Sequence, residues 1–69
     1  NPKQTRLTPR EVDVLHYVAC GKTDQEIGTI LGLGHYSVKD HLSNARRKLG
    51  AANRAHSVMI AIRDGHTMI

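Results

Sequence analysis

The 69-residue chain contains no tryptophan and no phenylalanine, and it has only two tyrosines. Its core must therefore be aliphatic, built mainly from Leu, Ile, Val, Ala and Met. A chain of this length has room for one core and buries only about 60 % of its unfolded surface. We expect residues 1–69 to form a single domain of modest stability. The scarcity of aromatic rings also counts against RNA binding, which usually needs rings on which bases stack.

Cysteine is nearly absent too, since Cys20 is the single one. One cysteine forms no internal disulfide, which fits a reducing compartment. Cys20 lies in an apolar stretch, where we expect a small buried side chain. No apolar run approaches the length of a membrane span and no signal peptide precedes Asn1, so we expect a cytoplasmic protein with no membrane partner. The missing start Met suggests a fragment of a longer protein.

Histidine is common, but the patterns that hold metals or carry out catalysis are missing. No two histidines lie four residues apart, and no cysteine or acidic cluster completes a metal site. No nucleophile elbow or phosphate-binding loop occurs either. We therefore expect no metal, no cofactor and no enzymatic activity. The histidines are His16, His35, His41, His56 and His66.

Acidic residues are outnumbered, with six Asp and Glu against ten Lys and Arg, which gives a net charge of +4. A basic surplus favours nucleic acid or an anionic membrane as a partner. Charge alone does not decide between these and a simply soluble domain, because many basic domains bind neither. The position of the charge along the chain therefore matters more than its amount.

Apolar periodicity and helix start and stop signals predict an all-α fold, a four-helix orthogonal bundle. Thr8 and Thr23 each precede a glutamate by three residues, the pattern of a capping box, and Asn53 can cap the last helix. Gly32 and Gly50 follow apolar stripes as helix stops. No strand pattern competes. The helices are expected at about residues 9–20, 24–31, 35–49 and 54–64.

The helix at 35–49 has one narrow apolar face, on which Val38 and Leu42 lie. A short helix and a tight turn lead into it. Hydrogen-bonding side chains near its start and basic ones near its end are what reading of the major groove of DNA requires. The alternative is a merely solvated face on a basic helical module that binds protein and has no DNA role. The polar residues of this helix include Tyr36, Ser37, Lys39, Asp40, Ser43, Asn44, Arg46 and Arg47.

Several motifs resemble, in the right order, the LuxR-type helix-turn-helix domain. They are residues 7–12, 26–27, 37–41 and 47–50, while residues 51–56 and 61–63 resemble the quorum-sensing branch of the family more than the phosphorelay branch. The resemblance implies a DNA-binding domain at the C-terminal end of a longer bacterial transcriptional regulator. It also implies contacts by position. Those to bases fall on Lys39, Asp40 and Ser43. Those to phosphates fall on Thr23, Gln25, Tyr36, Ser37, Arg46 and Arg47.

Three positions depart from the family pattern. Gly34 stands where Ser or Thr usually caps the recognition helix, so the cap has no side-chain bond. Gly28 replaces the usual Ala and permits close approach where the two helices cross, at a cost of about 1 kcal/mol in helix propensity. Asp40 is acidic beside phosphates, so it should either accept from a cytosine amino group or pair with Arg47.

The resemblance further implies a homodimer on an inverted-repeat operator in double-stranded DNA, paired through the last helix. We expect the core stripe of that helix to be Ala55, Val58, Met59 and Ile62. The predicted dimer contact is then the opposite face, formed by Ser57, Ile60, Ala61 and Asp64. The alternative is that its apolar residues are merely exposed and have no partner. An upstream sensory domain would bind an acyl-homoserine lactone or be a phosphorylated receiver, and RNA polymerase is a candidate further partner.

Overall fold

The computed structural model describes residues 6–65, and within that range it has helices and no strands. Each predicted helix boundary agrees with the structure to within one residue, whereas His66 lies outside the described residues. Within residues 6–65 no helix combines the length and the apolar character needed to cross a membrane. The helices are α1 (Pro9–Ala19), α2 (Asp24–Leu31), α3 (His35–Leu49) and α4 (Arg54–Arg63).

The predicted helix caps are present. The Thr8 hydroxyl accepts from the Glu11 N–H at 3.1 Å, and the Thr8 N–H donates to Glu11 Oε1 at 2.9 Å. Thr23 and Glu26 repeat this reciprocal arrangement at 3.1 and 2.8 Å. Asn53 Oδ1 accepts from a backbone N–H in the first turn of α4 at 2.9 Å. Each cap satisfies amide groups that have no partner inside the helix, which is why the helices begin at these residues.

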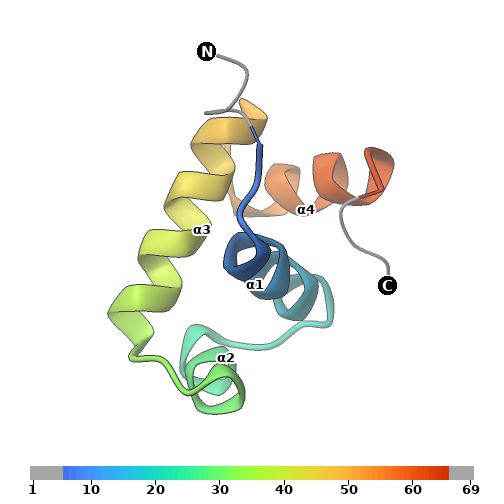
Figure 1. Ribbon diagram of the computed structural model, residues 1–69. Helices are drawn as coiled ribbons and strands as arrows, with labels where there is room; N and C mark the ends of the chain where they lie inside the picture. Colours follow the sequence, from blue (N-terminus) through green and yellow to red (C-terminus); the bar gives the residue numbers. More distant parts are fainter. Residues whose placement is uncertain (1–5, 66–69) are drawn as a thin grey trace.

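The helices surround one aliphatic core. α1 and α3 each contact all the other helices, whereas α2 and α4 do not pack against each other. Figure 1 shows α4 running across the direction of α3, with α1 seen nearly end-on beside them, as expected for an orthogonal bundle. The buried apolar side chains at the centre are Leu7, Val14, Leu15, Ile27, Val38, Leu42, Ala45 and Ala61.

The turn from α2 to α3 is tight because glycines permit it. Gly32 ends α2 with a φ of +72°, a left-handed conformation that costs little only for glycine. Gly28 lies against the turn, since a Cβ there would be 2.5 Å from the Leu33 carbonyl oxygen. The close approach predicted at Gly28 is therefore confirmed. The group that approaches is the backbone of the turn, however, and not a crossing helix.

Glu11 is a buried carboxylate that connects the start of α1 to the end of α3. The residue is 3 % exposed, and Lys48 Nζ donates to its Oε1 at 2.9 Å and to its Oε2 at 3.1 Å. The Lys48 side chain is itself only 22 % exposed. A charge in such a place is tolerated only when it is paired and hydrogen-bonded. This ion pair holds the last turn of α3 against the first turn of α1.

The predicted orientation of α4 is wrong. Ser57, Ile60 and Ala61, expected as an exposed dimer contact, are 0 %, 7 % and 0 % exposed. Ser57 can be buried because its hydroxyl donates to a backbone carbonyl one turn earlier at 3.0 Å. Asp64, the fourth predicted residue, is exposed and its carboxylate pairs with Arg63 at 3.1 Å. Three of the four predicted contact residues are therefore unavailable to a partner.

The face of α4 that was expected in the core is instead the outward one. Met59 is 68 % exposed and Ile62 is 37 % exposed. Ala55 is exposed as well, and Val58 is half-buried. Ala55, Met59 and Ile62 recur at the spacing of one helix face, and we refer to them as the α4 strip. The strip leaves apolar surface in contact with solvent.

The predicted burial of Cys20 is also wrong. The residue is exposed, and its Sγ lies 3.8 Å from Nε2 of His16, one turn earlier. Cys20 is the C-cap of α1 and is followed by Gly21 with a φ of +85°. The chain turns away from the core at this point, so the apolar stripe of α1 ends before it reaches the cysteine.

Replacing Lys48 by Met should destabilise the fold, because it leaves the Glu11 carboxylate buried without its cation. We expect a loss of about 1–3 kcal/mol in the free energy of unfolding, measured by urea denaturation. The matched control is Arg10→Met, which breaks an ion pair with Asp13 whose side chains are 44 % and 49 % exposed. That change should cost about 0.5 kcal/mol or less. Equal losses in the two variants would contradict the structural role of Lys48.

Candidate nucleic-acid interface

The outward face of α3 carries the polar residues singled out in the sequence. The predicted apolar stripe of α3 is buried and holds the helix from behind. On the other side Lys39, Asp40 and Ser43 are exposed, as is Ser37 in the first turn. Tyr36 is 73 % exposed. Their predicted accessibility is confirmed, so hydrogen-bonding groups line the N-terminal half of one open helix face.

The N-terminus of α2 lies beside this face, with Thr23 and Gln25 exposed. The Thr23 side chain is engaged as the helix cap, since its hydroxyl accepts from the Glu26 N–H at 3.1 Å. Hydrogen bonds from the Thr23 backbone and side chain hold the pKa of Glu26 below its ordinary value of 4.5. The N-terminus of a helix carries a partial positive charge that suits an anionic ligand.

The three basic residues at the end of α3 point in different directions. Arg46 is half-buried, and its Nη1 donates to a backbone carbonyl at 3.3 Å. Arg47 is exposed and donates to Asn44 Oδ1. Lys48 belongs to the buried ion pair with α1. Asp40 forms no ion pair within residues 6–65, so the predicted alternative of a pair with Arg47 is not found.

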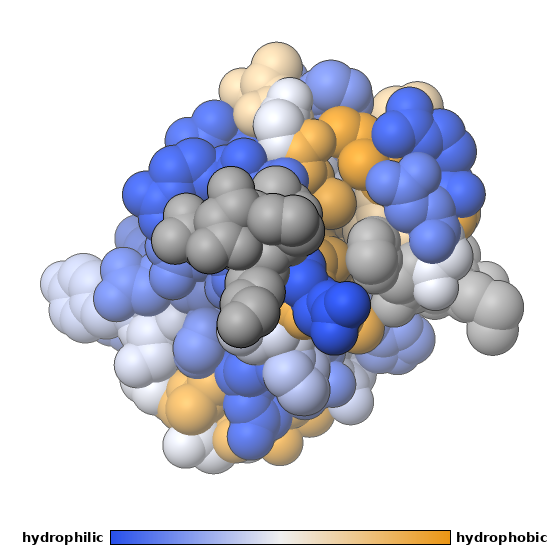
Figure 2. Space-filling view, turned by 45° about the horizontal axis from the view of Figure 1, so that its top comes forward, coloured by the Kyte–Doolittle hydropathy of each residue, from blue (hydrophilic) through white to orange (hydrophobic). Residues whose placement is uncertain are grey.

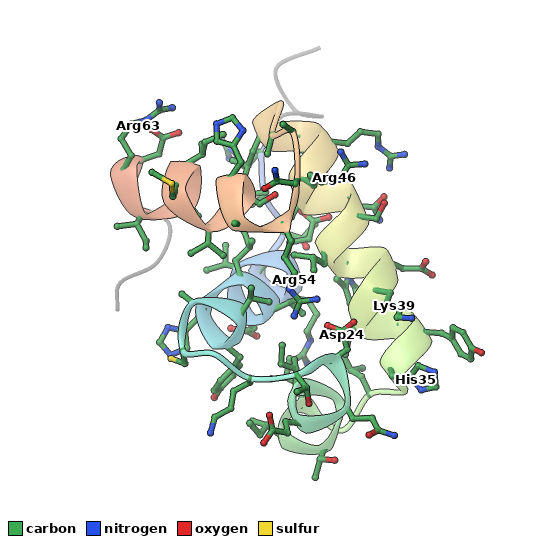
Figure 3. All side chains as sticks on the ribbon, turned by 180° about the vertical axis from the view of Figure 1, so that it is seen from behind. Asp24, His35, Lys39, Arg46, Arg54 and Arg63 are labelled. Atoms are coloured by element: carbon green, nitrogen blue, oxygen red, sulfur yellow. The ribbon has the colours of Figure 1, made fainter. Side chains whose placement is uncertain are left out.

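A shallow hollow lies where the N-terminal ends of α2 and α4 face the middle of α3. Arg54 Nη1 donates to Asp24 Oδ1 across it at 2.9 Å. This ion pair links α2 and α4, which do not otherwise pack together. Figure 3 shows the pair in the same region as Lys39 and Arg46 of α3. The α2–α4 hollow, as we refer to it, is lined by Asp24, Lys39, Leu42, Ser43, Arg46, Asn53 and Arg54.

Arg54 is the residue of this region that the sequence analysis missed. Its partner Asp24 lies 30 positions earlier in the chain, and no periodicity or cap signal connects the two. The one local signal is its place directly after the Asn53 cap, as the first residue of α4. That place puts a cation at a helix start, where it gains nothing from the helix dipole, so a role outside the helix could have been suspected.

The surfaces of α3 and α4 differ in polarity. On the face shown in Figure 2, hydrophilic residues gather over α3, whereas hydrophobic and hydrophilic residues lie side by side over α4. The exposed apolar residues of α4 are those of the α4 strip. The outward face of α3 is thus a polar surface suited to an anionic ligand, and the α4 strip is a narrow apolar surface of the kind that a protein partner can cover.

Comparison with known proteins gives consistent results. A family model described as bacterial regulatory proteins of the luxR family matches residues 5–61. The transcriptional activator protein BjaR1 of Bradyrhizobium diazoefficiens is 51 % identical over 59 residues. The HTH-type quorum sensing-dependent transcriptional regulator VjbR of Brucella ovis is 45 % identical over 62 residues. These alignments cover 86 % and 90 % of this chain but 24 % of each relative.

Among solved structures, that of the transcription factor GerE superposes with a TM-score of 0.86 at 26 % sequence identity. The match covers 90 % of this chain and 92 % of the GerE chain. GerE thus has nearly the whole described fold and little beyond it, whereas the chain spans about a quarter of the length of BjaR1 and VjbR.

The Glu26 capping box should give α2 a measurable pH dependence. Because the folded state lowers the pKa of Glu26, its stabilising contribution is present above 4.5 and is lost as the pH falls through the lower, folded pKa. Glu26→Gln keeps an acceptor for the Thr23 N–H but cannot ionise. The difference in urea midpoint between wild type and this variant should therefore shrink as the pH falls below 4.5. A difference that stays constant with pH would contradict this role of the carboxylate.

Proposed function

The chain belongs to the luxR family of bacterial regulatory proteins and has that family's helix-turn-helix DNA-binding domain, and we propose that it regulates transcription by sequence-specific binding to double-stranded DNA. In this proposal α3 lies in the major groove. The observation that carries the proposal is the one-sided burial of α3. Val38 and Leu42 anchor the helix in the core, while Lys39 and Ser43 stand exposed on the opposite side.

The side chains near the middle of α3 would read base edges. Lys39 donates to guanine, Ser43 donates or accepts, and Asp40 accepts from a cytosine amino group. Because Asp40 does not pair with Arg47, its carboxylate is available to accept a hydrogen bond from cytosine. An acidic side chain beside phosphates is repelled unless a base donor compensates, so Asp40 would raise selectivity more than affinity.

The surrounding residues would bind phosphates and set the orientation of α3 in the groove. Arg47 is exposed at the far end of α3, and Arg46 lines the α2–α4 hollow. At the N-terminal end of α3, the proposed phosphate contacts come from two residues at the N-terminus of α2 and two in the first turn of α3. These four are Thr23, Gln25, Tyr36 and Ser37. Together the two groups bracket the base-reading residues.

A dimer fits this surface, and the α4 strip is its contact in this proposal. Met59 and Ile62 are the largest exposed apolar side chains of α4. A two-fold contact through them buries the same strip of both chains. The two copies of α3 would then enter successive major grooves about 34 Å apart on an inverted repeat. This contact replaces the one predicted through the opposite face of α4.

We further propose that the chain is the C-terminal part of a longer cytoplasmic regulator. BjaR1 and VjbR are about four times as long as the matched region, and VjbR is named as quorum sensing-dependent. The additional length would hold a sensory domain that binds an acyl-homoserine lactone, with a phosphorylated receiver as the alternative. RNA polymerase would be a further partner at the promoter.

Lys39→Ala should weaken binding to a preferred duplex by about 1–3 kcal/mol and reduce discrimination against a scrambled duplex. The preferred duplex is first selected from a random pool with the wild-type chain. Arg47→Ala, the matched cation of α3, should weaken both duplexes about equally. It should also flatten the salt dependence by about one unit per chain, that is by about two units of a log–log slope near −7 for about eight phosphates per dimer. A wild-type chain that binds no duplex at low salt would favour a protein-binding module instead.

Met59→Asp should prevent two chains from assembling on one inverted-repeat duplex, because it places a charge in the apolar contact. Sedimentation velocity with labelled duplex should show one chain per duplex at concentrations where wild type gives two. The control is Ile30→Asp, which makes the same kind of change at an exposed position of α2 (47 % exposed). Two chains per duplex with Met59→Asp would rule out the α4 strip as the contact.

A further inference from the structure

The α2–α4 hollow concentrates positive charge beside the base-reading part of α3. Lys39, Arg46 and Arg54 are its three cations, and Asp24 is its one anion. Neutral hydrogen-bonding groups of Ser43 and of the α4 cap complete the polar lining. A surface with this excess of cations around polar donors suits an anionic group such as a phosphate.

Arg54 is a partly exposed cation whose ion pair joins the starts of two helices. It is the first residue of α4, and its ion pair with Asp24 reaches across to the first residue of α2. The Arg54 side chain remains 43 % exposed although that of Asp24 is only 19 % exposed. A guanidinium has five N–H donors in a fixed fork, and the bond to Asp24 uses one nitrogen. Arg54 therefore has the geometry to bind a second anion on its exposed side.

An exposed ion pair by itself stabilises a fold by less than about 1 kcal/mol. This limits what the Asp24–Arg54 pair can contribute as a link between α2 and α4. The pair does determine where the guanidinium lies, because a fixed carboxylate orients the planar fork. Positioning is thus a larger consequence of the pair than stability.

We infer that Arg54 contacts a phosphate of the DNA backbone in the α2–α4 hollow, next to Arg46, and that Asp24 positions its guanidinium there. This inference rests on the proposed function, since it needs α3 in the major groove. It adds a contact from α4 to those proposed from α2 and α3, so that three helices hold the same stretch of backbone. Asp24 also lowers the affinity for DNA, because its carboxylate lies near the phosphate and repels it.

The two partners of the ion pair should therefore affect DNA binding in opposite directions. Arg54→Gln removes a cation from the phosphate, so it should lower affinity for every duplex about tenfold at about 0.1 M salt and flatten the log–log salt slope by about one unit per chain. Asp24→Asn removes the negative charge but keeps a side-chain oxygen that accepts from the guanidinium, so Arg54 stays in position, the repulsion is lost and affinity should rise severalfold. A purely structural ion pair would instead lower affinity in both variants, because both weaken the same link.

The experiment measures binding of short fluorescent duplexes, one preferred and one scrambled, by anisotropy over a range of salt concentrations. Arg63→Gln is the matched control. Arg63 lies at the other end of α4, as Figure 3 shows. Its side chain is 72 % exposed, and its loss should leave affinity within about twofold. Urea denaturation of each variant checks that the chain is folded under the binding conditions.

The outcomes separate the inference from the function on which it rests. If Arg54→Gln has the same affinity and salt slope as Arg63→Gln, the phosphate contact is overturned. If the separate variant Lys39→Ala still loses discrimination, the proposed function is left intact. A loss of affinity in both Arg54→Gln and Asp24→Asn overturns it in favour of a structural pair. Absence of duplex binding by the wild-type chain at low salt overturns both proposals together.

Discussion

Glu11 accepts from the backbone of Thr8 and from the ammonium of Lys48 with one buried carboxylate, so the beginning of α1 and the end of α3 are held at one point. The other end of α3 is held by the close contact of Gly28 with the backbone of the turn. An α-helix between two fixed ends does not rotate about its axis without losing one of them. The outward direction of Lys39 and Ser43 therefore depends on contacts that neither residue makes.

The helices could be predicted from sequence because the interactions that begin and end them are local. The capping boxes of Thr8 and Thr23 are completed within three residues, and the left-handed Gly32 and Gly50 terminate α2 and α3 by their own conformation. The outward face of α3 could be predicted as well, because this helix has one apolar stripe and one polar side. The exposed residues of α3 followed from that stripe.

α4 could not be oriented in this way because it has two apolar stripes at the same spacing. One contains Ala55, Met59 and Ile62, and the other contains Ile60 and Ala61 together with a serine. The serine counts as polar in a sequence pattern, yet in the structure its hydroxyl is satisfied by the carbonyl of the preceding turn and it is fully buried. The choice between the stripes is made by packing against the other helices. That information is not local to residues 54–63.

Nonlocal pairing also limits what net charge says about the candidate interface. Lys48 and Arg54 each pair with a carboxylate far away in the chain, and sequence alone gives no reason to treat them differently. Burial does distinguish them, because the Glu11 side chain is 4 % exposed and Lys48 22 %, whereas Arg54 is 43 % exposed. A phosphate cannot replace a buried partner without leaving a desolvated charge behind. It can approach a half-exposed guanidinium without breaking the existing bond. The accessibility of each ion pair, more than the sign or number of charges, therefore decides which cations of this small basic domain serve the fold and which can serve a ligand.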